Sequence, residues 1–271
     1  MATAGELVRR SAVPVHEAER LLAVASGLTR AQLVIGRDLP GDVVERFDDL
    51  VAERRSGTPL QYLEGTVHFG PLELLTDRRA LIPRPETERL WERVVEVVGE
   101  ATPAVVVDIC TGSGNLALAL KYTFPEAAVY GTDVSRDALS LAAANGEHTG
   151  LDVTWVEGDL FATLPDSIRG GVDVIVGNPP YVAAPDYDGL PVDVRDHEPI
   201  GALVAGPGGD EVLARIAAEA GEWLAPGGLL ACEIGADQGA RAAELFAAFD
   251  PFVERDLAGR DRFVLGRSQV G

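Results

Sequence analysis

The stretch with the clearest chemical potential lies at residues 174–181, which run Val-Ile-Val-Gly-Asn-Pro-Pro-Tyr. Its apolar residues predict a buried strand, which Pro179 and Pro180 must end because proline lacks an N–H group and fixes φ. Asn178 and Tyr181 should therefore lie at the carboxyl edge of a sheet, where open α/β sheets bind their ligands. An amide oxygen, a stiff backbone carbonyl and an aromatic face suit a planar –NH2 group. The stretch therefore predicts a site for a substrate amide or amine.

A glycine-rich turn follows an earlier apolar run at residues 104–109. The turn comprises Asp108, Ile109, Cys110, Thr111, Gly112, Ser113, Gly114 and Asn115. Glycines allow the backbone to approach a ligand closely, and the N–H groups at a helix N-terminus favour an anionic group such as a carboxylate. The glycine spacing differs from the Gly-x-Gly-x-x-Gly pattern of dinucleotide-binding proteins.

Two aspartates end the next two predicted strands. Asp133 follows Gly114 by nineteen residues, a position from which a carboxylate can accept hydrogen bonds from both hydroxyls of a ribose. Asp159 can accept a hydrogen bond from an adenine amino group while Leu160 packs on the ring. A single aspartate at a strand end is more often a cap or a turn residue. Polar groups at three successive strand ends instead predict a nucleoside site.

The elements that must position these residues alternate between strand and helix from residue 103 onward. We expect strands at 104–109, 128–133, 153–156, 172–176 and 229–234, helices at 115–122, 136–148, 210–224 and 238–249, and a closing hairpin at 252–257 and 262–265. Such alternation predicts a largely parallel sheet with helices on both faces.

The front of the chain has a different pattern. Apolar stripes predict helices at 16–24, 29–35 and 42–55, and residues 61–75 predict a strand, a Gly-Pro turn and a second strand. Alternating prolines then hold Arg84 in an extended segment, and a helix should begin at Pro85 or Glu86.

Composition excludes several classes of function. A formal net charge of −20 argues against sequence-independent binding to nucleic acid, which needs a basic face. No apolar run is long enough to span a membrane, and the first residues lack a signal-peptide pattern. We therefore expect a cytoplasmic protein, and we expect it to be a monomer.

The metal-binding and redox residue types are few. Cys110 and Cys232 both lie in apolar runs and predict reduced core thiols. The four histidines have no metal-ligand spacing, so we expect no metal site.

Together, the glycine-rich turn and its companion aspartates resemble the Asp/Glu-x-Gly-x-Gly-x-Gly motif of class I S-adenosylmethionine-dependent methyltransferases. Cys110 departs from that motif, since it stands where the first glycine usually lies. Asn178 to Tyr181 resemble the Asn-Pro-Pro-Tyr motif of methyltransferases that act on planar amide or amino nitrogens.

Four other segments narrow the resemblance. Residues 54–63, 81–88, 194–199 and 256–262 are similar to segments of the release factor glutamine methyltransferases, also called the HemK or PrmC family. The resemblance implies a Rossmann-like α/β methyltransferase sheet, mostly parallel with an antiparallel closing strand. It also implies a helical substrate-binding or partner-binding domain at 1–58, a linking β-hairpin at 59–82 and the methyltransferase domain at 83–271.

This family methylates N5 of the glutamine in the Gly-Gly-Gln motif of class I peptide chain release factors, so the resemblance implies that substrate. We expect Asn178, Pro179, Pro180 and Tyr181 to be the catalytic residues and, with Arg84 and Glu198, to bind the substrate. We expect S-adenosylmethionine to contact Asp108, Cys110, Thr111, Gly112, Ser113, Gly114, Asn115, Asp133, Val134, Asp159, Leu160 and Asn178.

Three alternatives use the same residues. One is a nucleic-acid amino-methyltransferase, which would need a basic groove or a target-recognition domain and would flip its base. Another is methylation of a different protein glutamine or of a small metabolite. The third is a cofactor-binding scaffold without catalysis.

Overall fold

The computed structural model describes residues 2–34, 38–256 and 258–269. The chain forms two compact units, Met1–Val67 with Pro191–His197 and His68–Leu190 with Glu198–Gly271. Each unit is described separately below.

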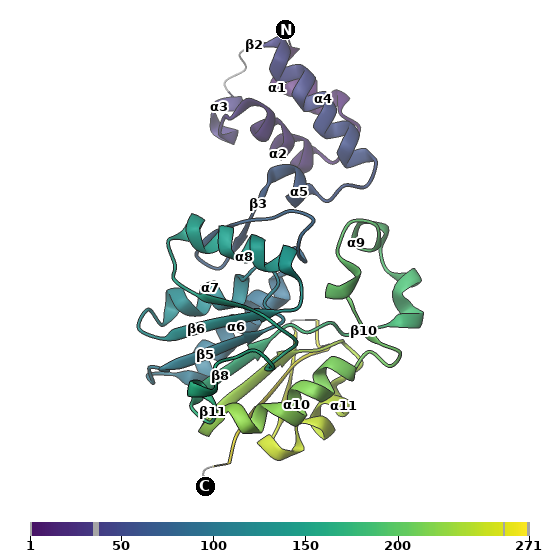
Figure 1. The fold of residues 1–271 in the computed structure, drawn as a ribbon. Helices are drawn as coiled ribbons and strands as arrows, with labels where there is room; N and C mark the ends of the chain where they lie inside the picture. The colour runs from purple at the N-terminus through teal and green to yellow at the C-terminus, as the bar shows by residue number, and fades with distance from the viewer. Residues whose placement is uncertain (1, 35–37, 257, 270–271) are drawn as a thin grey trace. The chain divides into compact units, whose positions relative to one another are not determined.

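The first unit is largely helical (Figure 1). Its helices are α1 (Ala4–Arg10), α2 (Val15–Ser26), α3 (Arg30–Val34), α4 (Gly41–Arg55), α5 (Leu60–Glu64) and the short α9 (Val192–Arg195). The strands β1 (Ala2–Thr3) and β2 (Asp38–Leu39) pair antiparallel. The apolar stripes of the helices meet in a core that includes the fully buried side chains of Leu7, Leu21 and Phe47.

Helix α1 was not predicted, although the sequence carries a signal for it. The Thr3 hydroxyl accepts a hydrogen bond from the Glu6 N–H, and the Glu6 carboxylate accepts one from the Thr3 N–H at 2.9 Å. This reciprocal capping box is typical of a helix start. The helix predicted at 29–35 is present as α3, but Ile35 lies outside the described residues.

The strand–turn–strand segment predicted at residues 61–75 is shorter in the structure. Strands β3 (Thr66–Phe69) and β4 (Leu72–Leu75) form a two-stranded sheet. The strand expected from Gln61 is wrong in its first half, because residues 60–64 form α5. Pro59 lies at the N-cap of this single helical turn, and Gly65 ends it with φ of +74°. A left-handed residue of this kind is the usual C-terminal stop of a helix.

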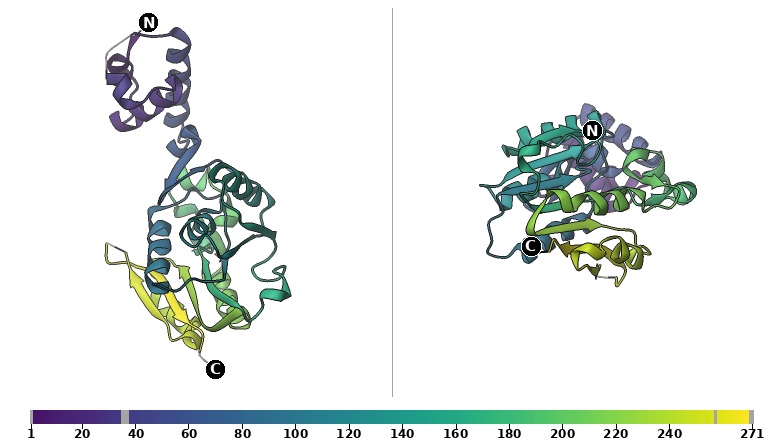
Figure 2. Two further views of the ribbon diagram at one scale, coloured as in Figure 1. Left: turned by 90° about the vertical axis from the view of Figure 1, so that its left-hand side faces the viewer. Right: turned by 60° about the horizontal axis from the view of Figure 1, so that its bottom comes forward.

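The second unit contains a seven-stranded sheet in the order β12-β13-β11-β8-β5-β6-β7 (Figure 1). The strands are β5 (Val105–Ile109), β6 (Ala128–Asp133), β7 (Thr154–Glu157), β8 (Val172–Gly177), β11 (Leu224–Glu233), β12 (Phe252–Arg255) and β13 (Asp261–Arg267). Strands β5, β6, β7, β8 and β11 are parallel, and β13 runs antiparallel to both β11 and β12. Figure 2 shows β12 and β13, drawn in yellow, at one edge of the sheet.

Helices cover both faces of this sheet. Helices α6 (Pro85–Val98), α7 (Asn115–Thr123) and α8 (Arg136–Thr149) lie on one face, and α10 (Glu211–Trp223) and α11 (Gly239–Leu245) lie on the other (Figure 1). Because side chains alternate along a strand, Val107 and Ile109 enter the core beneath α10 and α11, whereas Asp108 points toward α7.

Two predicted bounds in this unit are wrong by about four or five residues. The strand expected at 229–234 begins at Leu224, and the helix expected at 238–249 ends as α11 at Leu245, before a short 3-10 turn at Ala247–Phe249. The sequence predicts no strand or helix between residues 176 and 210. This segment nevertheless contains β9 (Val182–Ala183), which pairs in parallel with β10 (Val204–Gly206). No helix among the described residues is long and apolar enough to cross a membrane.

One buried amide ties the hairpin to the glycine-rich turn. Asn145 on α8 is fully buried, and its Oδ1 accepts a hydrogen bond from the Leu75 N–H at 2.6 Å. Its Nδ2 donates to the carbonyls of Leu75 and Ser113 at 3.2 and 3.0 Å. The side chain thus satisfies one N–H group and two carbonyls that come from two separate segments.

Replacement Asn145→Ala should destabilise the protein by about 2–4 kcal/mol, because it leaves these backbone groups buried without partners. Urea unfolding would measure the loss. Glu147→Ala, an exposed change on the same helix, is the matched control and should stay within about 0.5 kcal/mol of wild type. An equally small effect at Asn145 would contradict this role.

Candidate active site

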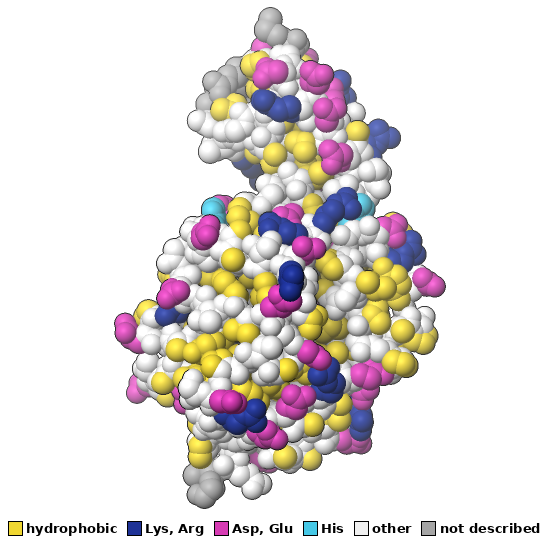
Figure 3. All heavy atoms as spheres, in the orientation of Figure 1, with side chains coloured by type: hydrophobic (Ala, Val, Ile, Leu, Met, Phe, Trp, Pro, Cys, Tyr) yellow, Lys and Arg dark blue, Asp and Glu magenta, His cyan; other side chains and the backbone are white. Residues whose placement is uncertain are grey.

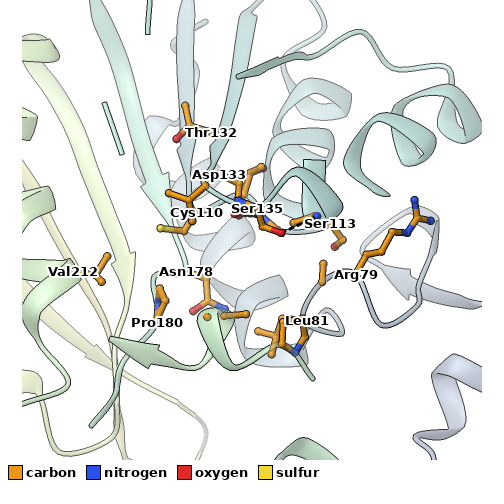
Figure 4. Close-up of a pocket in the computed structure, with 18 of the residues that line it drawn as sticks. Arg79, Leu81, Cys110, Ser113, Thr132, Asp133, Ser135, Asn178, Pro180 and Val212 are labelled. Carbon is orange, nitrogen blue, oxygen red and sulfur yellow. Dashed lines mark hydrogen bonds between the residues drawn. The ribbon is translucent and has the colours of Figure 1, made fainter. Parts of the chain in front are cut away.

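The predicted site residues converge on one edge of the sheet. Strand β5 pairs in parallel with β6 on one side and β8 on the other, so the three strands end together. A cavity of about 480 Å³ lies at this edge (Figure 4). Its volume is within the range of small-molecule and cofactor sites.

Most of the predicted residues line this cavity. The lining includes Arg84, Cys110, Thr111, Gly112, Ser113, Asn115, Asp133, Val134, Asp159, Leu160, Asn178 and Pro180. The other predicted residues, which are Asp108, Gly114, Pro179, Tyr181 and Glu198, lie outside this lining. Asp108, Gly114 and Glu198 hydrogen-bond to lining residues, and Pro179 and Tyr181 flank the lining residue Pro180 in the same loop.

Asp108 holds the glycine-rich turn from behind. Its Oδ2 accepts hydrogen bonds from the Thr111 hydroxyl at 2.6 Å and from the Ala117 N–H in α7 at 3.1 Å. Burial raises the pKa of the Asp108 carboxyl to about 7, although both hydrogen bonds favour the ionised form. The carboxyl therefore joins the end of β5 to the start of α7.

The turn itself depends on backbone conformations that favour glycine. Gly112 and Gly114 have φ of +55° and +81°. A Cβ atom at Gly114 would lie 2.6 Å from the Trp155 ring, whereas one at Gly112 would meet no atom within 4 Å. Gly114 thus allows close packing, and Gly112 presents bare backbone toward the cavity.

Cys110 occupies a position that would suit glycine. Its φ is +59°, in the left-handed region, where a side chain costs about 1–2 kcal/mol. This strain explains why the motif usually has glycine here. Both cysteines are free, and Cys232 is buried in the core, whereas Cys110 is half-buried, packs against the same core cluster and also lines the cavity. Burial, with Asp133 and Asp108 nearby, raises the pKa of the Cys110 thiol, which stays protonated at neutral pH.

Asp133 is held by backbone N–H groups at the end of β6. Its Oδ2 accepts from Gly112 and its Oδ1 accepts from Ser135, both at 2.9 Å. Burial raises the pKa of Asp133, and these hydrogen bonds oppose the shift. The carboxylate therefore lies against the glycine-rich turn at the cavity wall (Figure 4).

Asp159 and Leu160 follow β7. The Asp159 carboxylate pairs with Arg215 on α10 at 2.9 Å, a partner that the sequence did not indicate. Leu160, with φ of +54°, packs into the core beneath α10 and also borders the cavity. An amino group that binds Asp159 would therefore share this carboxylate with Arg215.

Asn178 begins the loop after β8. Its Nδ2 donates to the hydroxyl of Thr87 in α6 at 3.0 Å. The preceding Gly177 is required by close strand packing, because a Cβ there would lie 2.6 Å from the Ile109 carbonyl oxygen. Burial, with Glu233 nearby, raises the pKa of the Tyr181 hydroxyl, which is therefore neutral at physiological pH.

Arg84 and Glu198 form an ion pair. Arg84 Nη2 lies 2.6 Å from Glu198 Oε1, and the Glu198 side chain is only 1% exposed. Arg84 lines the cavity and Glu198 lies behind it. These two members of the predicted substrate-binding set therefore form one unit in which Glu198 fixes Arg84.

Two hydroxyl groups of residues that line the cavity lack hydrogen-bond partners among the described residues. Ser113 Oγ and Thr132 Oγ1 belong to residues of the cavity lining, are buried and have no hydrogen-bond partner within the described part of the chain. Such groups can bind ligand hydroxyl, amino or carboxylate groups. In residues 2–34, 38–256 and 258–269, the structure contains no cluster of three or more His, Cys, Asp or Glu that could hold a metal ion.

Comparisons with known proteins identify the family. A family model described as the PrmC N-terminal domain matches residues 3–65, and one described as the methyltransferase small domain matches residues 92–189. The release factor glutamine methyltransferase of Deinococcus radiodurans is 41% identical over 268 residues, which cover 97% of this chain and 95% of that protein. The protein of the same name from Mycolicibacterium smegmatis is 40% identical over 259 residues, with 93% and 90% covered.

The chain belongs to the release factor glutamine methyltransferase family. A solved structure of the 16S rRNA N2 G1207 methyltransferase of T. thermophilus, in complex with AdoMet and guanosine, has the same fold. It superimposes with a TM-score of 0.55 at 19% identity and covers 75% of this chain and 50% of that one. The predicted fold class, a mostly parallel methyltransferase sheet with an antiparallel closing strand and a helical N-terminal domain, is confirmed.

The sequence analysis missed two residues at the site of this family member. Thr87 and Glu233 are each only 2% exposed, and the Thr87 hydroxyl donates to Glu233 Oε2 at 2.7 Å. Burial raises the pKa of Glu233 to about 7. The available signals were weak: Thr87 stood inside the Pro-Arg-Pro-Glu-Thr-Glu segment, and Glu233 is a lone acid at the end of an apolar strand.

Replacement Asp108→Asn should change how stability depends on pH between about 4 and 7. The carboxyl ionises near its usual value of about 3.9 in the unfolded chain but near 7 in the folded protein, so unfolding releases a proton in this window. The contribution of Asp108 to stability therefore falls as the pH rises through the window. The asparagine variant lacks this titration. Between pH 4 and pH 7, its free energy of unfolding should therefore rise by roughly 2–4 kcal/mol relative to that of the wild type.

Urea unfolding at four pH values would measure this difference. Asp166→Asn, a change at a side chain that is 93% exposed, is the control and should keep the wild-type pH dependence. If the Asp108→Asn curve runs parallel to wild type, Asp108 does not titrate as the structure indicates.

Proposed function

We propose that this protein transfers a methyl group from S-adenosylmethionine to N5 of the glutamine in the Gly-Gly-Gln motif of class I peptide chain release factors. The proposal is supported by identity of about 40% to release factor glutamine methyltransferases along nearly the whole chain. The single observation that carries the chemistry is that Asn178 lines the same cavity as the glycine-rich turn and Asp133.

The cofactor site we propose consists of the predicted residues at three strand ends. Asp133 would bind the ribose, and the turn from Cys110 to Asn115 would bind the amino-acid part. Asp159, Val134 and Leu160 would surround the adenine. When bound, S-adenosylmethionine would supply an electrophilic methyl group on its sulfonium sulfur.

The substrate amide nitrogen is a weak nucleophile because its lone pair is delocalised into the carbonyl. We propose that Asn178 Oδ1 and the Pro179 carbonyl oxygen accept hydrogen bonds from its two N–H groups. These bonds would orient the nitrogen and increase its electron density, so that catalysis rests on positioning and electrostatics. Pro180 keeps the loop stiff, and Tyr181 would flank the amide plane. The surplus proton would leave to solvent or to a transient acceptor.

A protein substrate fits the surface better than nucleic acid does. The net charge is −20, and the Lys and Arg side chains on the face in Figure 3 are scattered among acidic side chains rather than gathered in a stripe. Phosphate backbones need a basic face. We propose that the helical unit and the Arg84–Glu198 pair help to hold the release factor. A cytoplasmic location and a monomeric state stay predictions.

Replacement Asn178→Ala should lower kcat at least 100-fold, because it removes an acceptor that fixes the reacting amide. Binding of S-adenosylhomocysteine, measured by calorimetry, should stay within about threefold of wild type. Near-normal turnover by this variant would show that Asn178 does not grip the substrate.

The substrate class is tested by transfer of a radiolabelled methyl group. The assay compares a release factor, the same factor with its Gly-Gly-Gln glutamine replaced by alanine, and duplex DNA. Label on the intact factor alone is expected. Label on DNA would instead favour an amino-methyltransferase of nucleic acid, and label on both forms of the factor would place the target at another residue.

A further inference from the structure

Three side chains form a series of hydrogen bonds that ends at Asn178 in the proposed site. Asn178 Nδ2 donates to Thr87 Oγ1 at 3.0 Å, and Thr87 Oγ1 donates to Glu233 Oε2 at 2.7 Å. The members come from the loop after β8, the first turn of α6 and the end of β11. Thr87 and Glu233 are each 2% exposed, so the bond between them is shielded from bulk water, whereas Asn178 is half-buried and lines the cavity together with Thr87.

The chemistry of the three groups gives this series a direction. A carboxylate only accepts hydrogen bonds, and a threonine hydroxyl has a single hydrogen to donate. Once that hydrogen goes to Glu233, the Thr87 oxygen can only accept, and the Asn178 group that faces it must be the –NH2 group. The opposite amide orientation would set Oδ1 against an oxygen with no hydrogen left to donate.

We infer that Thr87 and Glu233 are positioning residues that hold Asn178 in the one amide orientation able to accept a hydrogen bond from the substrate glutamine. We call this pair the Thr87–Glu233 relay. The inference rests on the proposed function, since it assigns Oδ1 of Asn178 to the substrate amide. Without the relay, a turned Asn178 would present its own N–H groups to the N–H groups of the substrate.

The relay depends on the ionisation of Glu233. Burial raises the pKa of Glu233 to about 7, and the charges that face it are Arg84 and Glu86 near the start of α6 and Arg262 on β13. The Tyr181 hydroxyl lies near the same carboxylate. A protonated Glu233 can donate to Thr87, which can then donate to Oδ1 of a turned Asn178. Protonation of Glu233 thus permits the reverse order of donors and acceptors along these hydrogen bonds.

The pH dependence of activity follows from this reversal. The active direction needs ionised Glu233, which predominates above a pKa of about 7. We therefore expect kcat/KM of the wild type to be about tenfold lower at pH 6 than at pH 8. Because Asp108 also has a pKa of about 7, the informative quantity is the ratio of wild type to a Glu233 variant at each pH.

The test uses the full-length enzyme with a release factor as substrate. Thr87→Val removes the hydroxyl at nearly constant volume and should lower kcat/KM at least tenfold, while Thr87→Ser should stay within about threefold of wild type. Glu233→Gln should lower kcat/KM at pH 8. It should also remove the increase in kcat/KM between pH 6 and pH 8 that ionisation of Glu233 causes in the wild type. Binding of S-adenosylhomocysteine should change less than threefold in all three variants.

Two controls separate positioning from folding. Thr149→Val alters a hydroxyl that bonds only to carbonyls of its own helix α8, and it should leave kcat/KM unchanged. In an Asn178→Ala background, Thr87→Val should cause no further loss, because no amide is left to orient.

Several outcomes would overturn the relay. These are wild-type activity of Thr87→Val, an unchanged pH profile in Glu233→Gln, or full additivity of Thr87→Val with Asn178→Ala. If Thr87→Val also loses cofactor binding, the pH profile of Glu233→Gln decides whether the relay orients Asn178. A wild-type enzyme that methylates no release factor would instead overturn the proposed function and the relay with it.

Discussion

The parallel pairing of β5 with β8 is the constraint on which the site depends. Gly177 lies opposite Ile109 in the register of these strands, and a Cβ atom at Gly177 would approach the Ile109 carbonyl oxygen to 2.6 Å. The two chains leave the sheet immediately afterward, one into the glycine-rich turn and the other into the Asn-Pro-Pro-Tyr loop. Proposed methyl donor and acceptor sites are therefore neighbours because two adjacent strands end at the same level.

Two buried carboxyl groups fix the geometry of the chain segments at this edge through hydrogen bonds. Asp108 joins the glycine-rich turn to α7, and Glu233 joins the end of β11 to α6 through Thr87. Burial raises the pKa of both carboxyls to about 7. An apolar residue at either position would avoid this desolvation cost, but it could not accept the hydrogen bond that orients the neighbouring threonine hydroxyl. These groups therefore favour a defined geometry at the site over maximum stability near neutral pH.

Cys110 shows how much variation the turn tolerates. It keeps the left-handed backbone conformation that the motif requires, at a cost of about 1–2 kcal/mol. Neighbouring contacts compensate for this strain. The Thr111 N–H donates to the Thr132 carbonyl at 2.9 Å, and the Thr111 hydroxyl donates to Asp108. The departure from glycine thus adds a side chain to the cavity wall, while φ of residue 110 lies in the left-handed region.

Local patterns in the sequence determined the alternation of strands and helices and the loop that two prolines impose. They also placed Asp108, Asp133 and Asn178 at or next to the ends of strands. These features depend on nearest neighbours, so composition and spacing were sufficient to predict them. The helix at residues 60–64 was missed because its apolar pattern also fits a short strand, and only the caps at Pro59 and Gly65 distinguish the two.

Only the tertiary structure decided which side chains bond to one another at the site. Thr87 lies 91 residues from Asn178 and 146 from Glu233, and Arg215 lies 56 residues from Asp159. No local pattern encodes such pairs, because their distances depend on how helices α6 and α10 pack on the sheet. The sequence by itself therefore determined which groups reach the active edge, and packing determined how they are oriented and charged.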